Sequence, residues 1–438
     1  MMNFGQCCSW LDDQDVSFRA RAGLIRAWVV LAVALFGFSW RLWLSQSDFP
    51  QVPFFRITAQ VPAAIELLLF SGVLVCLVGS FIWVSKRAGR YFLGIFAVLL
   101  AVLILLDQHR LQPWAYQFLI LSVIFAATTP RQTWFMARVL TISIYLYSAL
   151  SKFDFQFFTT LGPDFFRPFL DLFGAVGRQF GSAQLWRWTW IFPFGELLVG
   201  LALIFPKGRS VGLWGAVLLH AGLLWILGPM GLNHQPGVLL WNLFFIVQAV
   251  FLFGDCSFLC RMETRSDSTT SGNEVTVSAL GAGGQRLAFG VWFAALLLPF
   301  ASACNFYDHW PGWELYAPRT SRVKMELRPD LKETLPQPWL KFWKEPEGDA
   351  EYRPWCEFDL AQWSLTELGV PIYPQDRFQA GVALALARRL DNERGIRITW
   401  EGPSDRWTGE RATEQWLGRQ ALELAVGRFR VNAEPRPF

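Results

Sequence analysis

The sequence RVLTISIYLYSALSKFDFQFFTTLGPDFFR, residues 138–167, begins as an apolar helix that is long enough to enter a membrane. Its far end places Lys152 and Asp154 at the expected membrane boundary, and a Gly-Pro pair at 162–163 then interrupts the helix. Ionisable groups at membrane depth are costly and are frequently functional. A lysine at a helix end is also a common anchor to lipid headgroups, so these residues alone leave both roles open for Lys152.

The composition of the whole chain indicates a membrane protein. Of its 438 residues, 53% are hydrophobic and 17% are charged, whereas soluble domains carry about 25% charged residues. The net charge of +4 is too small to favour a nucleic-acid partner. The 7 cysteines form no C-x-x-C pair, which argues against a zinc site or a disulfide framework.

Nine apolar stretches approach the length of about 20 residues that crosses a bilayer. They cover 23–44, 62–84, 91–106, 113–129, 134–151, 187–205, 211–228, 237–254 and 287–304. The third and fourth are short, and Pro113 suits the first turn of a helix, so we expect a tight hairpin there. Segment 155–186 is aromatic and is broken by Gly and Pro, so we expect it to lie along the membrane interface or to dip partly into the bilayer.

The basic residues predict the orientation, because short cytoplasmic loops are enriched in Lys and Arg. They flank the first span and fill every second loop, at Arg19, Arg21, Arg26, Lys86, Arg87, Arg90, Arg131, Lys207, Arg209, Arg261, Arg265 and Arg286. Alternating spans place all of them on one side of the membrane. We therefore predict a multi-pass protein of the cell membrane with a cytoplasmic N-terminus, and with Lys152 on the opposite side.

The chain divides into two predicted domains. Residues 1–304 form a transmembrane helical domain that includes a Ser/Thr/Gly-rich cytoplasmic linker at 261–286. Residues 305–438 form an extracytoplasmic α+β domain, with strands expected at 322–328, 395–400 and 427–432 and helices at 376–391 and 409–426. The predicted fold class is an all-α polytopic membrane protein of nine transmembrane helices with a small C-terminal α+β extramembrane domain.

Several further ionisable residues fall inside or at the outer edge of the predicted spans, on the same side as Lys152. They are Glu66, Asp107, His109, Arg110, Glu196, His220 and His234. Each alone is compatible with a structural role, such as pairing with an arginine or a hydrogen bond to a neighbouring helix. Together, they predict a polar cavity that opens to the outer side.

We hypothesise that Lys152 is the base in this cavity, because burial lowers the pKa of an amine and lets it accept a proton near neutral pH. Glu196 and His220 are the candidate partners for proton relay, and we group them with Lys152 as candidate catalytic residues. The candidate cavity-lining residues are Asp154, Glu66, Asp107, His109 and His234. We predict no metal site.

The run YLYSALSKFDFQFFTTLGPDFF, residues 145–166, resembles the Y-x-x-A-G-x-x-K-x-D-x-x-W-x-x-G segment of vitamin K-dependent γ-carboxylases. The same pattern occurs in the related bacterial family of horizontally transferred transmembrane (HTTM) proteins. Lys152 falls on the lysine that the family assigns as the base acting on vitamin K hydroquinone, and Asp154 falls on the following acid. The sequence GLWGAVLLHAGLLW, residues 212–225, places His220 on a family histidine.

The resemblance has departures, and a second set of families is also similar. Phe157 and Phe158 lie near the position of the family's tryptophan. The DoxX/MauE membrane families look similar over the same helices.

These resemblances imply two functional hypotheses. The first is a quinone-linked or carboxylase-related membrane enzyme that uses Lys152 as base in an outward-facing cavity; its cofactor is unknown, and a quinone is the candidate. The second is a non-catalytic DoxX/MauE-like membrane scaffold or redox-associated assembly protein, whose domain 305–438 engages other envelope proteins. A transporter has less support, because the chain lacks an inverted repeat. The lipid bilayer is the partner that the residues predict directly.

Overall fold

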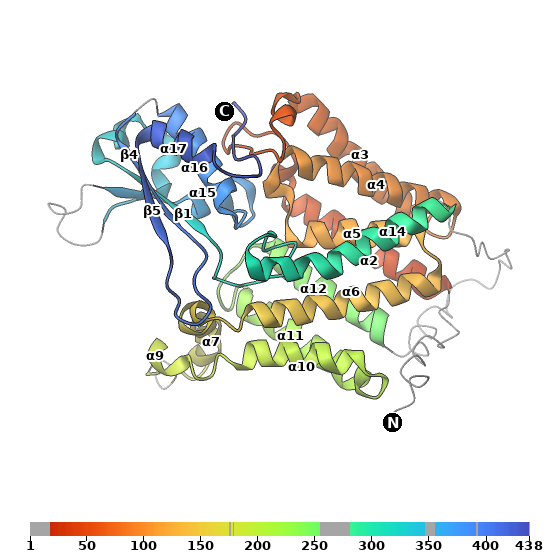
Figure 1. Cartoon of the computed structure of the whole chain (residues 1–438). Helices are drawn as coiled ribbons and strands as arrows, with labels where there is room; N and C mark the ends of the chain where they lie inside the picture. Colours follow the sequence, from red (N-terminus) through yellow and green to blue (C-terminus); the bar gives the residue numbers. More distant parts are fainter. Residues whose placement is uncertain are drawn as a thin grey trace.

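The structure is a computed structural model that describes residues 18–174, 177, 179–254, 281–346, 355–390 and 393–437. A helical bundle makes up most of it, and a smaller region with a β-sheet lies at one end of the bundle (Figure 1). We call residues 305–438 the C-terminal region.

Nine apolar helices build the bundle over the described residues. They are α2 (Phe18–Phe38), α3 (Ala63–Ile82), α4 (Arg87–Leu106), α5 (Pro113–Ala127), α6 (Pro130–Ser151), α10 (Ile191–Ile204), α11 (Arg209–Leu227), α12 (Pro236–Phe253) and α14 (Gly281–Leu297). Length and composition allow 7 stretches of the described residues to cross a membrane, while α5 and α10 are shorter apolar helices. Each predicted span therefore corresponds to one helix, and the prediction of a polytopic helical membrane protein is confirmed.

Local sequence explains where the key helices begin. In α6, Thr129 and Gln132 form a capping box, with Pro130 in the first turn. Pro113 and Pro236 occupy the same place in α5 and α12. Proline suits this position because the first helical N–H has no partner within the helix.

The bundle is apolar both inside and outside. Trp28 is fully buried, and its ring lies 5.3 Å from that of Phe118 and 5.9 Å from that of Phe125. Leu68 and Leu218, in contrast, are largely exposed on the bundle surface. Apolar side chains on all faces of a helix are typical of a membrane span, where lipid covers the outward side.

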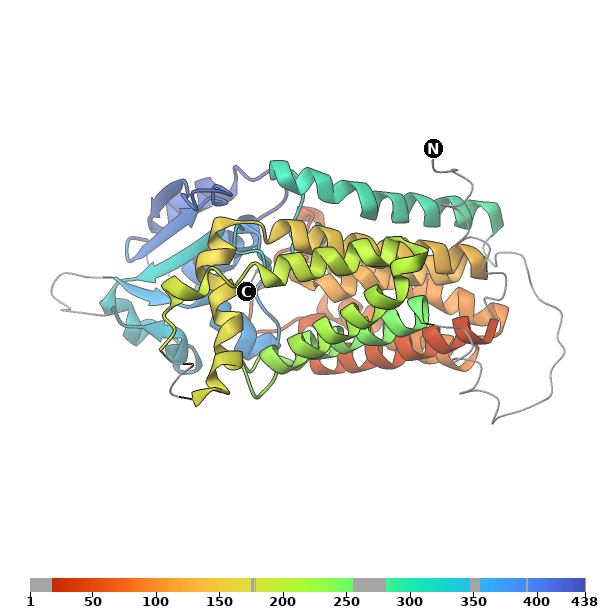
Figure 2. The ribbon, with the colours of Figure 1, turned by 90° about the horizontal axis from the view of Figure 1, so that it is seen from below.

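The aromatic segment after α6 does not continue any bundle helix. It contains a π-helix (Phe157–Leu161), α7 (Gly162–Asp171) and the short α9 (Ser182–Leu185). Figure 2 shows α7 running across the end of the bundle rather than along it. A position of this segment at the membrane interface stays a prediction.

The C-terminal region holds a five-stranded sheet with the order β2-β3-β1-β4-β5. The strands are β1 (Arg322–Leu327), β2 (Trp343–Lys344), β3 (Cys356–Phe358), β4 (Ile396–Glu401) and β5 (Thr413–Leu417), and all neighbours are antiparallel. The helices are α15 (Leu360–Leu368), α16 (Asp376–Arg389) and α17 (Gly418–Val426). These elements confirm a small α+β part, including the strands predicted at 322–328 and 395–400 and the helix at 376–391.

Two of the expected elements are wrong. The helix predicted over 409–426 begins only at Gly418, because residues 413–417 pair with β4 in the register Arg397↔Leu417. The strand predicted over 427–432 does not form; the chain there makes turns that begin on α17, with Arg428 N donating to Ala425 O at 3.0 Å. At 413–417 tertiary pairing overrides local preference, whereas at 427–429 local turn bonds at the end of α17 take the place of the strand.

The predicted linker at 261–286 lies outside the described residues up to 280, and its last residues belong to α14 instead of a linker. The side of the membrane on which the N-terminus lies stays a prediction. The C-terminal region contacts the same end of the bundle that carries Lys152, since Phe155 N donates to Arg406 O at 2.8 Å.

Candidate functional site

Lys152 lies at the C-terminal end of α6 and is 1% exposed. Its Nζ donates to Ser148 O at 3.0 Å, to Ser148 Oγ at 2.7 Å and to Glu196 Oε2 at 2.8 Å. Ser148 is placed for this contact because residues i and i+4 share one face of a helix, and α10, which packs against α6, brings Glu196. The three acceptors match the three N–H groups of an ammonium ion.

His220 on α11 is held by two hydrogen bonds. Its Nδ1 lies 2.8 Å from Asn242 Oδ1, and its Nε2 lies 2.8 Å from the hydroxyl of Tyr145. Asn242 Nδ2 donates to Val238 O at 2.9 Å, which fixes the orientation of the amide. The amide oxygen can therefore only accept, so the imidazole carries its proton on Nδ1 and its Nε2 can accept from the tyrosine.

A cavity of about 40 Å³ connects these two sets of contacts, and we call it the inner cavity. Its polar lining includes Tyr145, Ser148, Glu196, His220 and Asn242. The structure thus brings together Lys152, Glu196 and His220, as a cluster at the junction of α6, α10 and α11. Tyr145 and Asn242 also belong to this cluster through their hydrogen bonds to His220, although neither is among the candidate residues predicted from the sequence.

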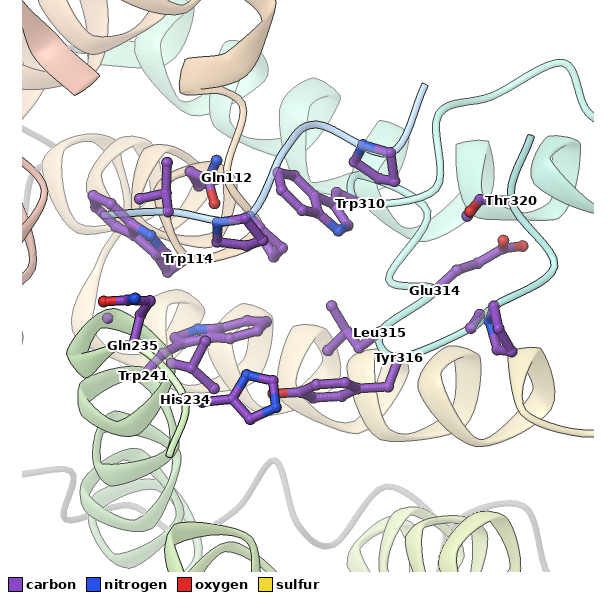
Figure 3. Close-up of a pocket in the computed structure, with 18 of the residues that line it drawn as sticks. Gln112, Trp114, His234, Gln235, Trp241, Trp310, Glu314, Leu315, Tyr316 and Thr320 are labelled. Carbon is purple, nitrogen blue, oxygen red and sulfur yellow. The ribbon is translucent and has the colours of Figure 1, made fainter. Parts of the chain in front are cut away.

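A larger cavity of about 260 Å³, the outer cavity, lies beside the inner one (Figure 3). It is lined by the first turns of α5 and α12, by residues 310–320 and by the loop between α15 and α16. Trp241, Leu315 and Tyr316 line both cavities. Of the predicted cavity-lining residues, His234 is here, and burial holds the pKa of its imidazole below the ordinary value.

The loop that covers these cavities has an unusual backbone. Asn305, Trp313 and Tyr316 have left-handed conformations, with φ of 59°, 59° and 56°. Such a conformation is costly for a bulky side chain and persists where the surroundings fix it. Trp313 is fully buried, with its ring 5.1 Å from that of Tyr116. The packing of Trp313 thus fixes the loop that presents Tyr316 to both cavities.

A second buried cluster surrounds Glu66, away from Lys152. The carboxylate of Glu66 is fully buried, and it pairs with Arg110 and with Arg436. Gln51 Nε2 donates to Glu66 Oε2 at 3.1 Å, and Arg436 Nη1 donates to Gln51 Oε1 at 2.7 Å. This cluster joins α3 to the C-terminal end of the chain.

Asp107 and His109 lie next to the Glu66 cluster. Asp107 Oδ1 accepts from His109 N at 3.2 Å, and burial raises the pKa of this carboxyl to about 6. The ring of His109 packs between Phe49 and Phe378, its Nε2 lies 3.0 Å from Pro371 O, and burial lowers its pKa to about 4. Glu66, Asp107 and His109 therefore lie near one another where the bundle meets the C-terminal region, and none of them contacts Lys152.

Asp154 belongs to neither cluster. Its Oδ1 accepts from the backbone N–H of Gln156 at 2.9 Å and of Phe157 at 3.3 Å, so it caps the turn that leads into the π-helix. Its Oδ2 is buried and has no hydrogen-bond partner among the described residues, and burial raises the pKa of the carboxyl. Within the described part of the chain, no group of three or more His, Cys, Asp and Glu side chains can hold a metal ion.

The nine apolar helices and the C-terminal sheet define the class, a polytopic membrane protein with a small α+β part. Within that class, the family model of methylamine utilisation protein MauE matches residues 129–236. The matched stretch contains α6 to α11 and therefore holds Lys152, Glu196 and His220, but it leaves out the C-terminal region. No curated protein and no solved structure matches the chain. The similarity thus supports the DoxX/MauE resemblance, and the HTTM resemblance stays an expectation.

Proposed function

We propose that the chain is a non-catalytic membrane scaffold or assembly protein of the MauE-like kind. In this role the helical bundle holds the C-terminal region, on the extracytoplasmic side, in a fixed position for contact with other envelope proteins. The match of the MauE family model to residues 129–236 supports the role proposed for the bundle.

The observation that carries the proposal is the way in which the C-terminal region is fixed to the bundle. Arg436 from the chain end pairs with Glu66 in α3. Arg377 from α16 donates to Gln108 Oε1, just after the C-terminal end of α4, at 2.8 Å. Domains on a common chain move relative to each other by default. Buried charged contacts suppress that motion, because their separation would leave charges unpaired.

The state of Lys152 agrees with a structural role. Its three N–H groups all have acceptors between 2.7 and 3.0 Å, one of which is the carboxylate of Glu196. An amine that acts as a base needs a free lone pair directed at its substrate. The ion pair joins α6 to α10 instead.

The C-terminal region also presents a surface for a partner. Leu417 at the end of the edge strand β5 is 63% exposed, and Leu424 on α17 is 69% exposed. Exposed apolar side chains on adjacent elements are typical of protein contact sites, and an unpaired edge strand can accept a strand of a partner.

Site-specific photo-crosslinking in native membranes tests the proposal with the full chain. A benzophenone amino acid at position 417 or 424 should give one discrete adduct, and the same probe at the exposed control position Glu357 should not. The substitution Arg436→Ala, which frees the chain end from Glu66, should weaken the adduct. Equal labelling at all three positions, or labelling at none, would count against a scaffold.

The second candidate function is a membrane enzyme, quinone-linked or carboxylase-related, with Lys152 as base. The inner cavity beside Glu196 and His220 favours it, because it leaves space next to the cluster. Titration of a quinone and its hydroquinone against the wild type and Lys152→Ala tests this candidate. Identical binding and turnover in both proteins would remove it.

A further inference from the structure

The outer cavity has mostly apolar walls that come from four parts of the chain. Trp114 and Trp241 from the bundle helices face Trp310 and Tyr316 from the covering loop (Figure 3). Pro371 also lines the cavity. The volume of about 260 Å³ is close to the lower end of the range of about 300–1,000 Å³ for small-molecule sites. Its walls are suited to an apolar molecule of modest size.

Hydrogen-bond donors without partners face this cavity. Among the described residues, no acceptor is assigned to the hydroxyl of Tyr316, to the indole N–H of Trp310 or to the side-chain amide of Gln235. Trp241, in contrast, donates to Gln117 Oε1 at 2.7 Å. All three side chains are partly exposed, so without a ligand they can donate to water, and they are free to donate to an acceptor on a bound molecule.

Two helix N-termini add to this preference. The first turns of α5 and α12 both line the outer cavity, and their N-cap residues Gln112 and Gln235 make no side-chain cap hydrogen bond. The prolines at the first helical positions have no N–H, but the N–H groups of the next residues, Trp114 and Gly237, have no partner within the helix, and the helix dipole makes this end positive. The electrostatics therefore favour oxygen acceptors or a negative charge.

The one carboxylate in the lining does not compete for the same space. Glu314 pairs with His309, and Ser302 Oγ donates to Glu314 Oε1 at 2.8 Å. The described lining contains no lysine and no arginine. The lining therefore offers donors and neutral acceptors but no carboxylate that is free to pair with a cation, which disfavours a cationic ligand even though four aromatic rings are present.

We propose that the outer cavity binds an amphipathic molecule whose head carries carboxylate or carbonyl oxygens and whose short apolar body lies among the tryptophan rings. The head contacts Tyr316, Trp310 and the first turns of α5 and α12. A free carboxylate and the ester carbonyl of an acyl lipid share this chemistry. The proposal is independent of the scaffold function, because it concerns a cavity inside the molecule and not the exposed surface of the C-terminal region.

Equilibrium binding of octanoate to the full chain in lipid nanodiscs tests the proposal, with empty nanodiscs as the control for partition into lipid. Competition by methyl octanoate separates the carbonyl source from the free carboxylate. Octyltrimethylammonium has the same tail with a cationic head. We expect saturable octanoate binding that octyltrimethylammonium displaces at least tenfold less well than octanoate itself, a difference of about 1.4 kcal/mol at 25 °C.

Two variants locate the binding. Tyr316→Phe removes only the hydroxyl and should weaken octanoate binding about tenfold, or about 1.4 kcal/mol. Val238→Trp fills the cavity from the first turn of α12 and should abolish binding. Tyr307→Phe is the matched control, because Tyr307 binds the hydroxyl of Tyr116 and does not line the cavity. Wild-type affinity in Tyr316→Phe and Val238→Trp, or tighter binding of the cation than of octanoate, would overturn the proposal.

Discussion

Two buried ionic clusters lie near the end of the bundle that meets the C-terminal region, and they differ in their surroundings. Glu66 pairs with two arginines, is fully buried and is also bound by Gln51. Glu196 pairs with the single cation Lys152 and lines the inner cavity. The carboxylate of Glu66 is enclosed by its two arginines and Gln51, while that of Glu196 has empty space beside it.

This difference distinguishes a buried ion pair that only stabilises the fold from a candidate functional site at membrane depth. A buried charge of either kind demands a partner, so its presence alone does not indicate chemistry. An adjacent cavity makes the charged groups available for binding or chemistry, because water or a ligand can reach them there. Substitutions in each cluster test whether the two differ in this way.

The largest effect is expected for Glu66→Ala. It leaves the guanidinium groups of Arg110 and Arg436 buried without their carboxylate, and removal of one partner from a buried pair costs about 3–5 kcal/mol. Equilibrium unfolding of the purified protein in detergent measures the loss. Glu326→Ala is the control, because its pair with Arg397 is partly exposed and should contribute less than about 1 kcal/mol. Similar losses of unfolding free energy in the two variants would show that the Glu66 cluster stabilises the fold no more than a partly exposed ion pair does.

The next effect is a pair of opposite pH dependences beside the Glu66 cluster. The pKa of Asp107 is raised from 3.8 to about 6, so its contribution to stability is present below pH 4 and is lost as the pH rises to 6. The pKa of His109 is lowered from 6.5 to about 4, so its contribution is present above pH 6.5 and is lost as the pH falls to 4. In the wild type the two trends oppose each other.

Single variants should separate these trends. In Asp107→Asn the histidine remains, so the free energy of unfolding should fall by about 3 kcal/mol between pH 6.5 and 4. In His109→Gln the aspartate remains, so the free energy should rise by about 3 kcal/mol as the pH falls from 6 to 4. The difference between each variant and the wild type across the pH series is the measurement. Parallel curves for all three proteins would contradict the burial of these two groups.

A smaller effect is expected for Lys152→Met, although it also breaks a buried ion pair. Glu196 borders the inner cavity of about 40 Å³, and a site of about 10–15 Å³ is enough for one water molecule. Water can therefore hydrate the remaining carboxyl, and we expect a loss of about 1–3 kcal/mol in the free energy of unfolding. The double variant Lys152→Met/Glu196→Leu should recover part of it. A loss as large as that of Glu66→Ala would remove the contrast between the clusters.

The sequence predicted the bundle well because each span is a long apolar run with a local start signal. Every one of the nine predicted spans became a helix, and Pro113, Thr129 and Pro236 mark where three of them begin. The structure also brings Lys152, predicted at the membrane boundary, close to Glu196 and His220, predicted inside their spans. Membrane depth is a one-dimensional quantity that a sequence encodes directly.

The same reasoning could not predict contacts between residues that are far apart in the sequence. Glu66 binds Arg436, which is 370 residues away and belongs to no periodic element. Tyr316 and Trp310 lie in a loop whose shape depends on left-handed residues and on the buried Trp313. Residues 413–417 form a strand only because β4 is available beside them. In each case the decisive contact is made by a distant part of the chain.

The smallest effect tests Asp154, which lies two residues after Lys152 but outside both clusters. Asp154→Ala removes the acceptor for the N–H groups of Gln156 and Phe157 and should cost about 1 kcal/mol. Asp154→Asn keeps that acceptor and removes the charge, so it should be nearly neutral at pH 7. Because burial raises the pKa of the native carboxyl, the Asn variant should gain stability relative to the wild type as the pH rises above about 4, which a series of unfolding measurements from pH 4 upward can detect. If Asn destabilises the protein as much as Ala, the charge itself is needed, and the guanidinium groups of Arg319 and Arg406 are then the partners to which this acid responds.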